Sequence, residues 1–123
     1  MKYALIALAA LTLPAQAADH TQVVKVIMVD NRFEPDHIAF QHGKPYQLDL
    51  ENHGKDMHEF TAPAFLKAAT IKDKRLLANG GTDIVVQSGK SVRINLIAPA
   101  AGDYDLTCAD HDWDGMVGRI TVN

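Results

Sequence analysis

Cysteine is almost absent from this sequence, since Cys108 is the only one among 123 residues. An internal disulfide is therefore excluded, and a single thiol in an oxidising compartment needs protection by burial or by a metal ion. An excess of charge is also lacking, because the formal net charge is only −3. Such mild acidity argues against a nucleic-acid partner.

Long hydrophobic runs are missing, apart from one near the N-terminus. Residues 3–13 carry no charge, follow the cation Lys2 and precede a proline and an Ala-Gln-Ala pattern. The run is roughly half of the ~20 residues that a membrane-spanning helix needs. These features predict a signal peptide over residues 1–17, cleaved after Ala17, and export to the periplasm. The mature domain, residues 18–123, would then be free of the membrane.

Internal repeats, charge blocks and Pro/Gly-rich linkers are also missing after the predicted signal, so we expect one domain. Apolar residues recur at short, strand-like spacing between turn residues, and helical periodicity is scarce. The predicted strands cover residues 21–29, 38–40, 46–50, 58–61, 84–87, 92–97, 102–108 and 117–122, and one short helix covers 64–69. About eight short strands predict an all-β antiparallel sandwich or barrel.

Residues suited to metal binding gather near the C-terminus as Cys108, His111 and Met116, in the pattern Cys-x2-His-x4-Met. Thiolate and imidazole suit copper, and a thioether is a weak, soft axial ligand that hard cations do not select. If Cys108 ends one strand and Val117 begins the next, all three side chains lie on or beside the intervening loop. Gly115 gives that loop the freedom to bring Met116 back. The pattern predicts one bound copper ion.

A type 1 copper site takes two histidines, one cysteine and a long axial methionine, so this loop needs another histidine. The candidates are His20, His37, His42, His53 and His58. The first four follow the predicted cleavage site or lie at turns and in a polar loop. His58 instead opens a β-like run, where a strand end can carry it to the copper loop. We therefore expect the ligands to be His58, Cys108, His111 and Met116.

The same residues resemble a known family. The segment 52–58, followed later by Cys-x2-His-x4-Met and Val-Gly-x-Ile-x-Val, is similar to the plastocyanin and pseudoazurin branch of the cupredoxins. The resemblance extends over residues 21–123 and implies a Greek-key β-sandwich of about eight strands with copper near one end. It also implies that His58 and His111 are imidazole ligands, Cys108 the equatorial thiolate and Met116 the axial thioether.

Departures from the family pattern lie beside the ligands. Many relatives carry Asn after the first histidine ligand and Pro before the second, where this chain has Glu59 and Asp110. Asp110, Asp112 and Asp114 place three carboxylates around His111. Because negative charge near the metal favours Cu(II), we expect a lower reduction potential than an apolar loop would give, unless these acids are simply solvated.

Two further features bear on partners. Trp113 is a candidate contact for a redox partner, or else a lid on the site. The basic cluster of Lys67, Lys72, Lys74 and Arg75 is interpreted as a solvated excursion between strands, with a partner-binding face as the alternative. A monomer is the default expectation.

Two functions fit these features. The first is one-electron transfer between redox proteins, such as a cytochrome and a copper enzyme, by Cu(I)/Cu(II) cycling, which is not an enzymatic activity. The second is copper tolerance, in which a periplasmic protein binds or oxidises excess copper, with His20, His42 and His53 to spare.

Enzymatic interpretations and a zinc site are weaker. Cys108 and His111 would need an orienting third residue and an oxyanion site to act as nucleophile and base. Multicopper and binuclear oxidase sites need His-x-His pairs or a second cysteine, and the sequence has neither. Thioether is also a poor zinc ligand.

Overall fold

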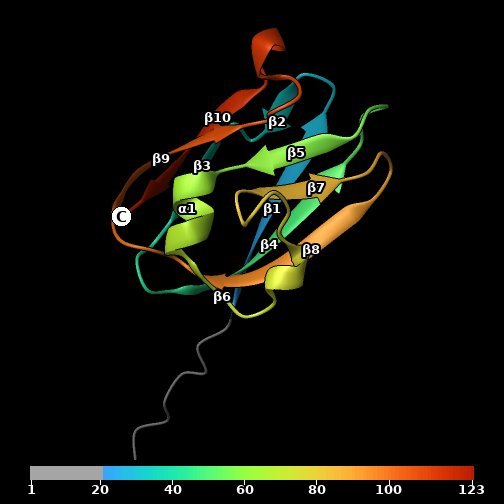
Figure 1. The fold of residues 1–123 in the computed structure, drawn as a ribbon. Helices are drawn as coiled ribbons and strands as arrows, with labels where there is room; N and C mark the ends of the chain where they lie inside the picture. Colours follow the sequence, from blue (N-terminus) through green and yellow to red (C-terminus); the bar gives the residue numbers. More distant parts are fainter. Residues whose placement is uncertain (1–20) are drawn as a thin grey trace, which may run out of the picture.

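The computed structural model describes residues 21–123, and the predicted signal peptide lies outside the described residues. This part of the chain folds into two packed five-stranded sheets with one short α-helix beside them (Figure 1). The first sheet has the order β2-β1-β4-β8-β6, made of β1 (Gln22–Val29), β2 (Arg32–Glu34), β4 (Pro45–Asn52), β6 (Thr70–Ile71) and β8 (Ser91–Ile97). The second has the order β3-β10-β9-β5-β7, made of β3 (His37–Phe40), β5 (His58–Thr61), β7 (Asp83–Val86), β9 (Gly102–Thr107) and β10 (Val117–Val122).

The predicted all-β Greek-key sandwich with one short helix is confirmed, and two details differ from the prediction. Strands β2 and β6 have only three and two residues, too few for a period-2 pattern to show in the sequence. Strand β1 pairs with β4 in parallel, and β3 pairs with β10 in parallel, whereas the other strand pairs are antiparallel. Pairing direction depends on how the chain crosses between the sheets, which the spacing of apolar residues does not record.

The core lies between the sheets because strand residues alternate between inside and outside. In β8, for example, Ile94 and Leu96 are buried while the residues beside them are not. Aromatic side chains fill one part of this core: Phe40 contacts Tyr46 and Phe65 with ring centroids 4.9 and 5.1 Å apart, and Phe65 lies 5.7 Å from Tyr104. The sandwich is therefore a packed scaffold that can hold a site at its end.

The helix α1 (Pro63–Ala68) lies close to the predicted range of 64–69. Pro63 occupies the first turn, where its missing N–H costs no helical hydrogen bond, and Phe65 and Leu66 face the core. Among residues 21–123, no helix is long and apolar enough to cross a membrane. The segment after α1 contains the short 3₁₀ turn η1 (Lys74–Leu76). Lys67 in α1 and Lys72, Lys74 and Arg75 after it are all exposed or partly exposed, which fits both a solvated excursion and a partner-binding face.

Candidate metal centre

Two neighbouring strands bring the first two predicted ligands together. His58 is the first residue of β5, and Cys108 comes directly after the last residue of β9. These strands are paired antiparallel, with Thr61 opposite Thr107. A histidine in the middle of the chain and a cysteine near its end therefore reach the same end of the sandwich.

The loop between β9 and β10 supplies the other two predicted ligands, and it projects at the top of the molecule in Figure 1. Backbone hydrogen bonds fold it tightly: His111 N–H donates to the Cys108 carbonyl at 3.0 Å, and Met116 N–H donates to the His111 carbonyl at 3.2 Å. A 3₁₀ turn η2 (Asp112–Asp114) ends at Gly115, whose φ of +84° is in the left-handed region. The predicted need for Gly115 agrees with this conformation.

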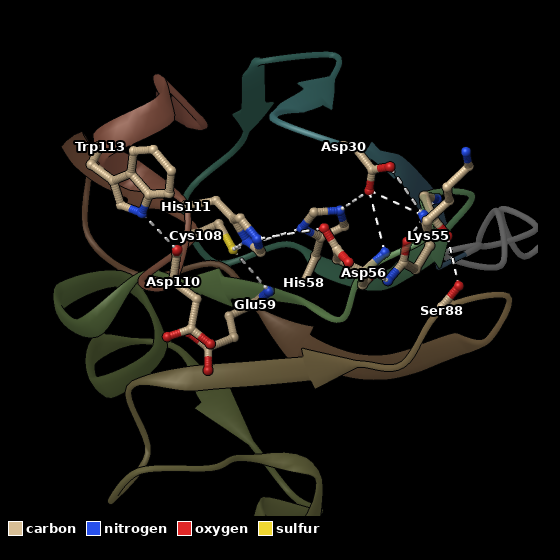
Figure 2. Close-up of polar contacts among 12 residues, drawn as sticks. Asp30, Lys55, Asp56, His58, Glu59, Ser88, Cys108, Asp110, His111 and Trp113 are labelled. Atoms are coloured by element: carbon tan, nitrogen blue, oxygen red, sulfur yellow. Dashed lines mark hydrogen bonds and ion pairs between the residues drawn. The ribbon is translucent and has the colours of Figure 1, made fainter.

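His58, Cys108 and His111 converge on one point, as Figure 2 shows. Their metal-binding atoms all lie within 4.8 Å of one another. The Cys108 Sγ is 3.3 Å from Nδ1 of His111 and 3.9 Å from Nδ1 of His58. His58 and Cys108 are fully buried, while the His111 side chain is 18% exposed. Both imidazoles thus turn their Nδ1 atoms toward the thiol.

Met116 is fully buried beside this cluster. The Cys108 N–H donates a hydrogen bond to the Met116 carbonyl at 3.0 Å, so the backbone of the methionine is fixed next to that of the cysteine. The role of the thioether as the axial ligand stays a prediction.

The environment of Cys108 fits a bound soft cation. Its Sγ accepts a hydrogen bond from the Glu59 backbone N–H at 3.3 Å. Burial nevertheless raises the pKa of the Cys108 thiol, and the backbone N–H donors around the sulfur offset only part of that rise. A metal ion must therefore displace the proton if the thiolate is to persist. One thiolate and two imidazoles form a donor set that fits one type 1 copper ion.

Two contacts that the sequence did not predict hold the ligands from outside. Asp30, in the turn between β1 and β2, has its Oδ1 3.0 Å from Nε2 of His58. Hydrogen bonds from the Lys55 N–H, and then from His58, hold the pKa of Asp30 below its ordinary value. Thr61 accepts a hydrogen bond from the Ala109 N–H at 3.3 Å, which ties β5 to the ligand loop.

Asn52 braces the segment that leads to His58. It is buried, and its side-chain amide donates to the carbonyls of Asp56 at 2.8 Å and Val86 at 2.9 Å. Its Oδ1 accepts from the Gly54 N–H at 2.9 Å. An Asn before a glycine-containing loop was visible in the sequence, but its burial was not.

The remaining histidines of the described chain have other contacts. His37 hydrogen-bonds with Thr121, His42 with the Pro99 carbonyl, and His53 with Glu51. Within residues 21–123, the trio of His58, Cys108 and His111 is the one group of three His, Cys, Asp or Glu residues close enough to share an ion. The ranking that set His58 above these three histidines agrees with this placement.

The family of the Cupredoxin-like domain matches residues 2–122. This chain belongs to that family. A comparison with curated protein sequences found no significant match.

Solved structures resemble this cupredoxin in fold. A reduced auracyanin from the photosynthetic bacterium Roseiflexus castenholzii superposes with a TM-score of 0.63 at 18% identity, covering 84% of this chain and 98% of that one. Auracyanin A from Chloroflexus aurantiacus, described as a "blue" copper protein, gives a TM-score of 0.62 at 17% identity, covering 85% and 100%. A reduced amicyanin variant gives 0.51 at 18% identity, covering 89% and 88%.

The residues that depart from the family pattern fall into two environments. Asp110, Asp112 and Asp114 are exposed, whereas Glu59 is buried and its Oε2 has no hydrogen-bond partner. Trp113 is 77% exposed, yet its Nε1–H donates to the Asp110 carbonyl at 3.1 Å. The cupredoxin therefore presents a fixed indole among solvated carboxylates beside its metal centre.

Proposed function

We propose that this cupredoxin carries single electrons between redox proteins in the periplasm. When bound, copper supplies the one-electron Cu(I)/Cu(II) couple. The observation that carries the proposal is the buried convergence of His58, Cys108 and His111 on one point. Fixed protein ligands change little when the charge of an ion changes, which favours rapid electron exchange. The likeness in fold to the "blue" copper protein auracyanin A supports the same function.

His111 is the route by which electrons would leave the site. His58, Cys108 and Met116 are fully buried, and His111 alone among the four predicted ligands reaches solvent. Trp113 and Val117 are exposed on the same loop or just after it, with Asp110, Asp112 and Asp114 around them. We propose that the redox partner docks here with an apolar contact ringed by positive charge, because complementary charge steers association.

We propose that the chain is an electron carrier and not an enzyme. Two surface hollows on residues 21–123 both include Tyr46 in their lining, and neither includes His58, Cys108, His111 or Met116. A substrate cleft would need such a hollow over the reactive groups. Donors that converge on one point suit the binding of a single ion, which fits electron transfer.

Copper tolerance is the alternative function. The idea that His42 and His53 are spare copper ligands gains no support, because their rings hydrogen-bond to the Pro99 carbonyl and to Glu51. Growth of a deletion strain separates the two functions. Loss of an electron carrier impairs respiration when copper is scarce, whereas loss of a tolerance protein matters only when copper is added.

The experiment that tests the copper site is a visible absorption spectrum of the mature protein loaded with Cu(II), beside its Cys108→Ser variant. We expect an intense thiolate-to-copper band in the wild type that is absent from the variant, and a reversible one-electron redox titration. A pale wild-type protein that binds Cu(II) would contradict the proposal.

A further inference from the structure

Asp30 contacts the buried histidine ligand on the side away from the metal. The carboxylate lies in the turn between β1 and β2, and its Oδ1 is 3.0 Å from Nε2 of His58 (Figure 2). His58 is fully buried, and the Asp30 side chain is 39% exposed. The buried imidazole is therefore hydrogen-bonded to a carboxylate that itself reaches solvent.

The position of Asp30 is itself fixed by the segment before His58. Its Oδ1 accepts from the Lys55 N–H at 3.0 Å and the Asp56 N–H at 3.4 Å, and its Oδ2 accepts from the Lys55 N–H at 3.2 Å. These three hydrogen bonds from two backbone N–H groups restrict the rotation of the carboxylate. The same side chain thus ties down the loop and the imidazole that follows it.

Gly54 leaves the space that this pair of side chains needs. A Cβ at position 54 would clash with Oδ1 of Asp30 and would lie 2.9 Å from Nε2 of His58. Real Cβ atoms almost never approach other atoms so closely, so any larger residue would force the two side chains apart. The local sequence is therefore compatible with the contact only because a glycine stands there.

We propose that Asp30 is the positioning residue for His58: its carboxylate accepts the Nε2–H, keeps the lone pair on Nδ1 directed at the copper site, and strengthens the binding of Cu(II) over Cu(I). A carboxylate behind a ligating imidazole fixes the tautomer and raises the donor strength of the ring. Removing such a partner typically costs about 10- to 100-fold in metal affinity.

The two histidines are unequal in this respect. The closest ion-pair partner of His111 is Asp56, whose Oδ2 is 4.0 Å from Nε2 of His111, beyond hydrogen-bond distance. His58 is thus the anchored ligand, and His111 is the ligand left free for contact with a partner protein. Asp56 also provides a matched control, because it places the same charge near the other ligand without the hydrogen bond.

The test compares Asp30→Asn with Asp56→Asn in the copper-loaded protein. Asp30→Asn should keep the thiolate-to-copper band, because Cys108 is intact, but lower the ratio of Cu(II) to Cu(I) affinity at least tenfold. This change raises the reduction potential by about 59 mV for one electron. Asp56→Asn should raise it by less than half as much. Equal shifts in the two variants would show a through-space charge effect and would overturn the proposal.

A second measurement needs neither a variant nor a metal. Nitrogen-15 NMR of the metal-free wild-type protein should show His58 protonated at Nε2 and unprotonated at Nδ1, with slow exchange of the Nε2–H. The opposite tautomer would overturn the proposal. The inference rests on the copper site of the proposed function, and the two fail separately: the absence of the intense band removes the type 1 site, whereas the tautomer tests Asp30 alone.

Discussion

The backbone N–H of Glu59 donates a hydrogen bond to Cys108 Sγ at 3.3 Å, while the carboxylate of Glu59 is buried with its Oε2 unpartnered. One residue therefore stabilises the sulfur through its backbone and places an acidic side chain in the interior. Burial, followed by the negative charges of Asp110 and Asp83, raises the pKa of Glu59. The fold therefore favours the neutral form of Glu59 more than water does.

This pKa shift gives the metal-free protein a pH-dependent stability. Because the folded-state pKa of Glu59 lies above its unfolded value, its stability contribution is fully present below the unfolded pKa and is lost as the pH rises through the folded pKa. Glu59→Gln should therefore stabilise the metal-free protein at pH 7 by about 1–3 kcal/mol and have little effect near pH 4. Urea unfolding at the two pH values measures the difference, and an equal gain at both would contradict the expectation.

Met116 should set the reduction potential if its thioether is the axial ligand. Met116→Leu keeps similar volume but removes the weak donor, so it should raise the potential, whereas Met116→Gln supplies a harder oxygen donor that favours Cu(II) and should lower it. Each shift should correspond to about a tenfold change in relative affinity, or roughly 59 mV. Redox titration of the two variants measures this, and identical potentials would show that residue 116 does not touch the ion.

Trp113 should affect docking without affecting the fold. Its side chain is 77% exposed, so Trp113→Ala should change the free energy of unfolding by less than about 0.5 kcal/mol. The second-order rate of electron exchange with a positively charged redox protein should fall about tenfold. The control is Val23→Ala, an exposed apolar residue on β1. Stopped-flow kinetics measures this rate. Equal rates for the wild type and Trp113→Ala would show that the partner docks elsewhere.

Gly118 is a packing requirement of β10. A Cβ there would lie 2.5 Å from the Asp36 carbonyl oxygen and 3.0 Å from Cδ2 of Leu106. Since backbone cannot yield as a flexible side chain can, Gly118→Ala should destabilise the protein by about 1–3 kcal/mol with the copper band unchanged. The neighbouring Val117→Thr, at an exposed position, should cost little. Chemical denaturation of both variants gives the comparison, and a neutral Gly118→Ala would contradict the clash.

The parts of the site that lie close together in sequence could be predicted, because local geometry governs them. Cys108 and His111 belong to one loop between two strands whose alternation is visible in the sequence, and the chemistry of the side chains indicated copper. The role of Met116 as a ligand stays a prediction. His58 was harder, since it lies far along the chain. Its place at the start of a β-like run after a loop identified it correctly as the histidine that joins Cys108 and His111.

Contacts set by tertiary structure could not be predicted in the same way. Asp30 precedes His58 by a long stretch of chain and meets it only because the turn after β1 packs against the loop before β5. In the sequence, Asp30 only follows the strand predicted over residues 21–29. Likewise, Glu59 is buried because other parts of the fold cover it. The residues around it in the sequence do not indicate that its carboxylate lacks a hydrogen-bond partner.

The complete burial of Cys108 protects the metal-free protein from oxidation to a disulfide-linked dimer. A disulfide requires two sulfur atoms at about 2 Å, and a sulfur enclosed by the core cannot approach the sulfur of a second chain without unfolding. Demetallation therefore does not commit the chain to covalent dimers. The emptied protein stays refillable, and the occupancy of the site follows the copper supply in both directions.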